Sequence, residues 1–212
     1  MTRAVCVGAL LFFLLPFAAM ADGIDLTNQY GSVTILTSGI TSRQSELKSF
    51  GGITASAGHA LGRVYFSTGA LISGSLWAGG TFSSIGSVFD ILGVGSKMKT
   101  LAGQNVKGNV GIFSGTFVGP IEWTLVASSK FFREYQLSGQ IQGMLWNGRM
   151  VSGTTQQIIN THWNKGTIDS NMGSIRMGIT HISSTPEPGS WGLFSLGLLT
   201  MTGLIRRRLS TT

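Results

Sequence analysis

The sequence contains little cysteine, little proline and little charge. Its one cysteine is Cys6, so the chain can form no internal disulfide and no cysteine-rich metal site. Charged residues make up 11% of the 212 residues, and only four are prolines. A chain of this length is large enough to bury a hydrophobic core without disulfides. These absences exclude a disulfide scaffold and a redox-active thiol in the body of the protein.

Recognisable catalytic motifs are absent as well. Gly93-Val94-Gly95 has no third glycine at the spacing of a dinucleotide-binding loop, and no Gly-x-Ser-x-Gly elbow stands beside a plausible helix. The histidines are scattered without metal-ligand spacing: His59, His162 and His181. The carboxylates that could form a glycosidase pair are equally dispersed: Asp90, Glu122, Glu134 and Asp169. The sequence therefore predicts no catalytic residue, no metal, no cofactor and no enzyme.

The net charge of +7 is concentrated partly at the two ends of the chain. Arg3 and the three arginines 206–208 lie in terminal segments, and without both ends the body from 22 to 185 has a net charge of +4. The nearest approach to a basic cluster is Lys97, Lys99 and Lys107, which has no interleaved aromatic residues. Nucleic-acid binding requires such a patch, so nucleic acid is not an expected partner.

The first 21 residues have the three-part pattern of a secretory signal. Arg3 supplies a positive charge, and an apolar stretch of 15 residues follows from 4 to 18. This stretch is shorter than the roughly 20 residues that a membrane span needs, which argues against a permanent anchor. Ala19 and Ala21 place small residues where signal peptidase cleaves. We therefore predict a helical signal peptide over 1–21, removed after Ala21.

A second targeting pattern occupies the other end. Pro186, Glu187 and Pro188 precede the uncharged run 190–205, and three arginines follow it, namely Arg206, Arg207 and Arg208. A helix of that run would be about 24 Å long, short for a lasting span. The arginines would remain cytoplasmic by the positive-inside rule, so the body would face the other side. The prolines favour an extended, accessible segment before the membrane.

This tail resembles the PEP-CTERM sorting signal of Gram-negative bacteria, with the triplet, the apolar helix and the basic cluster in order. The resemblance covers about 25 residues and implies processing by an exosortase-type membrane enzyme. It also implies a host that makes extracellular polysaccharide, a transient stay in the inner membrane, and delivery to the cell envelope, cell surface or extracellular matrix. A plain C-terminal anchor with a chance Pro-Glu-Pro is the alternative.

The body has the period-two alternation of half-buried strands. In 134–145, Tyr135, Leu137 and Ile141 fall on one face, and Glu134, Gln136 and Gln140 fall on the other. Asn147-Gly148 follows and predicts a two-residue hairpin turn, with 134–146 paired to 149–159. Other predicted strands are 33–37, 63–68, 71–82, 88–92, 112–118, 121–125 and 175–179.

Many short strands with glycine-rich turns predict an all-β fold. We favour an antiparallel β-sandwich, with a closed β-barrel as the alternative. Irregular segments are expected at 93–109 and 162–172. The predicted organisation is a signal peptide at 1–21, a β-rich body at 22–182, a linker at 183–189, a transmembrane sorting helix at 190–205 and a basic cytoplasmic tail at 206–212.

The function expected from these features is a structural or binding protein of the cell surface or exopolysaccharide matrix. The alternative is a secreted hydrolase that acts on extracellular polysaccharide. Among the tryptophans, Trp123 is in phase with Ile121 and Leu125, which predicts a core position. Trp146 beside the hairpin turn and Trp163 in an expected loop are the candidate carbohydrate contacts.

Overall fold

The computed structural model describes residues 23–94, 98–99, 105–106, 109–164 and 167–184. Strands account for the regular structure of these residues, as the sequence predicts. Their bounds are β1 Gly23–Gln29, β2 Ser32–Leu36, β3 Gly39–Phe50, β4 Ile53–Thr54, β5 Gly62–Ser67, β6 Leu71–Ser75, β7 Gly79–Phe82, β8 Val88–Val94, β9 Met98–Lys99, β10 Asn105–Val106, β11 Asn109–Ser128, β12 Phe132–Leu145, β13 Met150–Asn164 and β14 Thr167–Ser184.

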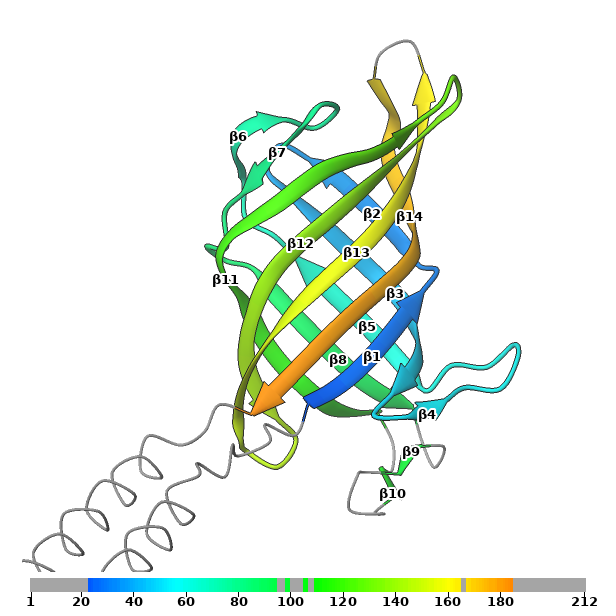
Figure 1. Ribbon diagram of the computed structural model, residues 1–212, viewed down its shortest axis with the longest axis vertical. Coiled ribbons are helices and arrows are strands. Elements are labelled where there is room, and N and C mark those ends of the chain that lie inside the picture. Colours follow the sequence, from blue (N-terminus) through cyan, green and yellow to red (C-terminus); the bar gives the residue numbers. More distant parts are fainter. Residues whose placement is uncertain (1–22, 95–97, 100–104, 107–108, 165–166, 185–212) are drawn as a thin grey trace, which may run out of the picture. The chain divides into compact units, whose positions relative to one another are not determined.

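Eight of these strands form a closed antiparallel barrel (Figure 1). Their order around the wall is β1, β3, β5, β8, β11, β12, β13 and β14, and β14 pairs with β1 to close the ring. The preferred sandwich is therefore wrong, and the alternative of a closed barrel is confirmed. Both architectures give each strand one apolar face, so alternation cannot separate them. The deciding contact joins Gly23 to Ser183, at opposite ends of the body.

The alternating apolar residues fill the inside of the barrel. Tyr135, Leu137 and Ile141 of β12 are buried, whereas Gln140 and Gln142, on either side of Ile141, are exposed. Trp123 is 1% exposed, which confirms its predicted core position. The two periodic faces of each strand thus become the packed interior and the polar exterior of the wall.

Inward-facing glycines make room for large aromatic rings. A Cβ built on Gly139 would lie 2.8 Å from Cδ1 of Phe117, and one on Gly143 would lie 2.8 Å from Cζ of Phe113. Gly115, opposite Gly143, would likewise place a Cβ 2.7 Å from the Phe113 ring. The aromatic rings therefore occupy the space that a side chain would take at these glycines. This packing offsets the weakening that glycine otherwise causes in a strand.

A polar cluster lies inside the same barrel. The Asn28 amide nitrogen donates to Ser45 Oγ at 2.7 Å and to Gln157 Oε1 at 2.9 Å. Gln157 donates in turn to Thr155 Oγ1 at 2.9 Å, and the Thr155 and Thr180 hydroxyls are 2.8 Å apart. All five side chains are buried. Mutual hydrogen bonding offsets the cost of removing these groups from water.

The remaining strands extend the barrel wall. β2 continues β1 after a kink at Tyr30 and Gly31, where φ is 62° and 85°, and it pairs with β14 and β3. β7 pairs with β11 beyond the end of β8, and β6 pairs with β7 as a hairpin. Short β4 pairs with β3, and β9 pairs with β10 in a separate sheet. The predicted strand 71–82 is therefore two strands with a turn.

The predicted Asn147-Gly148 turn joins β12 and β13, but its geometry differs. Only Gly148 has a positive φ, of 80°, and the Leu145 amide donates to the Arg149 carbonyl at 3.0 Å. The Gly148 amide donates to the Leu145 carbonyl at 2.9 Å. The loop therefore has three residues and a bulge at glycine, because a two-residue type I′ turn needs two positive φ values.

Three further sequence predictions change. β1 and β3 were not predicted, because Asn28 and Ser45 put polar residues on their inner faces. Gln44, at φ 63°, also shifts the register of β3 and interrupts its alternation. β13 reaches Asn164 and β14 begins at Thr167, so the expected irregular stretch 162–172 is largely strand. The stretch 93–109 contains the ends of β8 and β11 together with β9 and β10.

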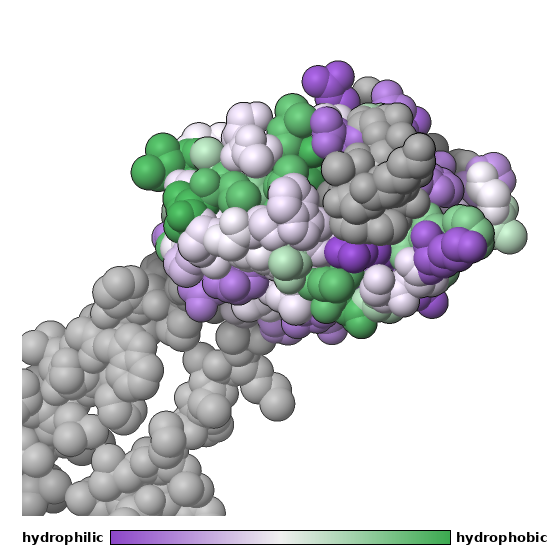
Figure 2. Space-filling view, turned by 90° about the horizontal axis from the view of Figure 1, so that it is seen from above, coloured by the Kyte–Doolittle hydropathy of each residue, from purple (hydrophilic) through white to green (hydrophobic). Residues whose placement is uncertain are grey.

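One end of the barrel displays apolar side chains. Figure 2 looks down on the end that is uppermost in Figure 1, and apolar residues gather on its left, the side of β6 and β7. Ile72 of β6 is 64% exposed, and Ile85 in the loop before β8 is 85% exposed. The opposite end holds Gly23, Ser184 and the β12–β13 turn.

Candidate functional site

The outer face of β11 to β14 carries two adjacent rows of mostly polar side chains. In the first row, Gln140 stands between Val118 and Thr154, and Thr154 stands opposite His181. Successive residues point to opposite faces of a strand, so these four share the outer surface. With strands about 4.8 Å apart, the row spans roughly 14 Å. It runs across the strands and around the barrel wall.

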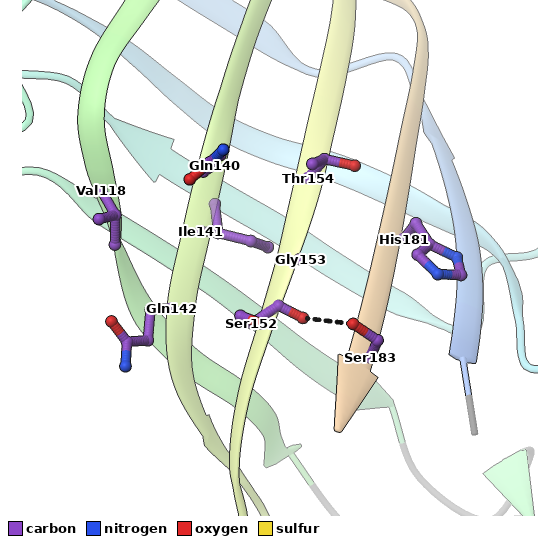
Figure 3. A pocket seen from close by; sticks show the side chains of 9 residues that line it. All are labelled: Val118, Gln140, Ile141, Gln142, Ser152, Gly153, Thr154, His181 and Ser183. Carbon is purple, nitrogen blue, oxygen red and sulfur yellow. Dashed lines mark hydrogen bonds between the residues drawn. The ribbon is translucent and has the colours of Figure 1, made fainter. Parts of the chain in front are cut away.

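The second row lies two residues further along each strand. Gln142 stands between Thr116 and Ser152, and Ser152 stands opposite Ser183. The Ser183 hydroxyl reaches the Ser152 carbonyl at 3.5 Å, the dashed line in Figure 3. Amides and hydroxyls of this kind can both donate and accept hydrogen bonds. The two rows therefore offer alternating donors and acceptors without a strong charge.

A shallow groove of about 320 Å³ lies along these rows. Figure 3 shows the side chains that line it, drawn from four neighbouring strands. Gly153 contributes no side chain, and a Cβ built there would overlap the His181 carbonyl oxygen. Its lining is Val118, Gln140, Ile141, Gln142, Ser152, Gly153, Thr154, His181 and Ser183. The groove is thus open to solvent and suited to a ligand that lies along the surface.

A histidine–carboxylate contact borders the groove at the seam of the barrel. His181 Nδ1 lies 2.6 Å from Asp25 Oδ1 on β1, and the side chains are 52% and 79% exposed. The imidazole lies against Gly23, where a Cβ would be 2.6 Å from its Cε1. An exposed pair of this kind adds little stability, about 0–1 kcal/mol. Its structural effect is to hold the His181 ring toward β1.

The two predicted carbohydrate contacts lie far apart. Trp146 sits in the β12–β13 turn and is 36% exposed. Trp163 lies near the other end of β13, opposite Ile168, and its side chain is outside the described side chains. Trp163 is thirteen residue steps from Met150 along β13, which corresponds to roughly 40 Å of strand. The structure therefore does not bring the two tryptophans into one site, and neither stands among the groove residues.

Sequence reasoning gave no role to Trp77, which is the most exposed of the described tryptophans at 51%. It lies in the β6–β7 turn, and its carbonyl accepts hydrogen bonds from Arg133 Nη1 at 2.7 Å and Tyr135 Oη at 3.0 Å. Trp123 Nε1 also donates to the neighbouring Leu76 carbonyl at 2.8 Å. The backbone is held while the indole remains exposed. The sequence signal that could have identified an exposed turn at Trp77 is the Ser-Gly-Ser before it and the Gly-Gly after it.

The Tyr135 side chain occupies a low-dielectric position at this contact. Its ring stacks on Trp123 with centroids 4.4 Å apart and an interplanar angle of 10°. Burial raises the pKa of the Tyr135 phenol above its usual value near 10, and the Arg133 guanidinium partly opposes this by hydrogen bonding and charge. Tyr135 therefore acts as a neutral hydrogen-bond donor to the hairpin.

The carboxylates that the sequence offered for a glycosidase pair have structural partners on the barrel surface. Glu134 accepts from Arg176 Nη1 at 2.6 Å, and Asp90 accepts from the Ser114 hydroxyl at 2.7 Å. The Thr81 hydroxyl donates to Glu122 on β11. Glu134 on β12 pairs with Ala127, which lies five residues beyond Glu122 along β11. Glu122 and Glu134 are therefore about 15 Å apart, beyond the 5–9.5 Å of a glycosidase pair. The Asp169 side chain is not among those described.

In the part of the chain that the structure describes, no group of three or more His, Cys, Asp or Glu side chains comes together to hold a metal ion. None of the described residues belongs to a helix with the length and apolar character needed to cross a bilayer. The predicted signal peptide with Ala19 and Ala21, the sorting motif, the helix 190–205 and the arginine cluster all lie outside the described residues.

Comparison with protein families returned one match, to the PEP-CTERM protein-sorting motif, over residues 184–208. This match contains Pro186, Glu187, Pro188 and the three arginines that suggested the resemblance. It marks the chain as an exosortase substrate. Comparison with curated proteins gave no significant match. Comparison with solved structures gave none either.

Proposed function

We propose, from the premise that this chain is an exosortase substrate, that it is a non-enzymatic component of the cell surface or exopolysaccharide matrix. The sorting motif implies export and processing at a membrane. We further propose that the barrel binds polysaccharide along the groove on β11 to β14. The observation that carries this proposal is the pair of mostly polar rows across neighbouring strands, built from amide and hydroxyl side chains with His181 at one end.

The chemistry of the rows suits a polyhydroxylated chain. Gln140, Gln142 and Ser152 each present a group that can donate to or accept from a sugar hydroxyl. A net gain of about 0.5–1.5 kcal/mol per hydrogen bond gives only modest affinity for one short oligosaccharide. A polymer that engages many barrels would gain strength through effective concentration. Weak, repeated binding is the behaviour required of a matrix component.

The open shape of the groove favours binding over catalysis. A polysaccharide can lie along an open surface without its ends entering a pocket, whereas catalysis needs reacting groups held around one bond. The groove residues include no carboxylate, and the adjacent Asp25 is engaged by His181. Trp77, at the upper end of the barrel, provides a separate exposed ring on which a sugar could stack.

Affinity electrophoresis in gels containing the host's extracellular polysaccharide tests the proposal. We expect the released barrel to be retarded, and Gln140→Ala combined with Gln142→Ala to lose most of that retardation. The matched control is Arg63→Gln with Ser67→Ala, outward positions on β5, away from the groove. Equal retardation of all three proteins would refute the groove as the binding site. Release of reducing ends from the polymer would instead identify the hydrolase considered as the alternative.

A further inference from the structure

The two chain ends of the barrel lie beside the β12–β13 turn. Gly23 pairs with Ser183, and Ser184 pairs with Val151 at the start of β13. In Figure 1 the turn projects past the arrowhead of β14 at the lower end. Asn147 lies four residues beyond Val151, so the turn extends about 10 Å beyond Ser184. This turn is therefore the part of the wall that leads toward the start of the sorting motif.

Side-chain chemistry changes along this hairpin as it approaches the turn. The outward-facing groove positions on β12 and β13 are glutamine, serine and threonine, whereas the last outward pair is Met144 and Met150. These methionines are 49% and 50% exposed, and Trp146 between them is 36% exposed. Arg149 is exposed in the same turn. Tryptophan and arginine are residues that favour the headgroup region of a bilayer.

The length of the tail sets how far this turn can be from a membrane. Five residues lie between Ser184 and Ser190, where the uncharged run begins, so six Cα-to-Cα steps join them. Even fully extended, they reach about 20 Å. The headgroup layer on each side is about 5–8 Å thick. While the tail is inserted, a turn that extends about 10 Å past Ser184 is within reach of the headgroups.

We propose that the β12–β13 turn contacts the anionic membrane surface in the unprocessed chain. Trp146 and the two methionines enter the headgroup region, and Arg149 pairs with lipid phosphate. The contact is weak by itself but favoured by the tether, because the tail raises the effective concentration of the turn at the membrane. It keeps the end of the barrel at Ser184 close to the interface, and it is lost once the tail is removed.

This inference rests on the membrane-held stage of the sorting route, and it is independent of polysaccharide binding. The full chain with Cys6→Ser and Asn147→Cys carries a single thiol for an environment-sensitive fluorophore. Reconstitution uses vesicles of phosphatidylethanolamine with phosphatidylglycerol that contain brominated lipid. We expect a blue shift and strong quenching at this position, both weaker in phosphatidylcholine alone.

The matched control is the turn at the other end of β12. Lys130 lies 5.5 Å from the centroid of Phe131, which is 70% exposed, so this turn also combines a cation and an aromatic residue. The label at Ser129→Cys should remain unquenched, because this turn has similar side chains but lies at the opposite end of β12 from Ser184. Equal quenching at both turns, or quenching at neither, overturns the proposal. Self-quenching of the Asn147→Cys label that rises with protein density would indicate a second copy and also overturn it.

Processing in cells gives an independent readout. Replacing Trp146 and Arg149 by glutamine should slow exosortase processing about five- to tenfold in a pulse-chase experiment. The same replacement of Phe131 and Lys130 should leave the rate unchanged. Slowed processing without vesicle quenching would assign the turn to the enzyme and overturn the lipid contact. Polysaccharide retardation of the released barrel should be the same for both variants, which separates this test from that of the groove.

Discussion

Replacing Gly139 by alanine should destabilise the barrel through a single steric contact. The new Cβ would lie 2.8 Å from Cδ1 and 3.2 Å from Cε1 of Phe117. The Phe117 ring is held edge-on against Phe66 and Phe89, with centroids 6.5 Å and 5.7 Å apart. Because it cannot turn away without disturbing these rings, we expect a loss of about 1–3 kcal/mol from overpacking.

The measurement is thermal and urea unfolding of residues 22–185. For a barrel of this size, a loss of 2 kcal/mol lowers Tm by about 4–8 °C. Gly111→Ala is the matched control, because its Cβ would meet nothing within 4 Å and its φ is not positive. That change should be neutral or stabilising by up to about 1 kcal/mol, since alanine restricts the unfolded chain.

A double mutant identifies the contact responsible. Phe117→Leu alone should destabilise by removing core contacts, but combined with Gly139→Ala it should cost less than the sum of the two changes. We expect a coupling energy of about 1–2 kcal/mol. If Gly139→Ala behaves like Gly111→Ala, or if the two changes are additive, the glycine is not needed to accommodate the phenylalanine and the reasoning is refuted.

Three further predictions concern ionisation, the polar core and processing. The raised pKa of Tyr135 means that the folded barrel retains its phenolic proton more strongly, so stability should be full below about pH 10 and fall as pH rises through the folded pKa; Tyr135→Phe should flatten this alkaline loss in urea titrations at increasing pH. Gln157→Leu should cost about 1–3 kcal/mol by leaving the Asn28 amide oxygen without its partner, and adding Asn28→Leu should recover part of that loss in the same unfolding assay. Glu187→Ala should leave the barrel folded while the unprocessed chain accumulates in the inner membrane; normal processing, judged by mass and membrane fraction, would count against a role for the motif.

Local sequence patterns predicted much of the barrel wall. The buried face of β12 follows from the alternation of Tyr135, Leu137 and Ile141, and the position of the hairpin follows from Asn147-Gly148. They did not predict β3, where Ser45 faces inward and the bulge at Gln44 interrupts the period. Strand prediction therefore succeeded where apolar residues fill the interior, and it failed where hydrogen-bonded polar residues do.

The candidate site was less predictable than the strands. The outward positions of Gln140 and Gln142 follow from alternation, but their alignment with Thr154 and Ser183 depends on strand register. The sequence predicts a loop around Trp163, but this residue belongs to the long β13, which separates it from Trp146 in the turn. The position of Trp77 depends on hydrogen bonds that Arg133 and Tyr135 donate to its carbonyl from 56 and 58 residues away in sequence.

The sequence by itself determined the sorting motif at 184–208, the all-β class and most inward and outward faces, because these depend on residues adjacent in the chain. Only the tertiary structure decided between sandwich and barrel, through the pairing of β1 with β14. His181 and Asp25, which meet at that seam, are 156 residues apart in sequence. A period-two pattern records which side of a strand is buried, but it does not record which strand lies beside it, so closure and the polar rows across the wall appear only in the folded protein.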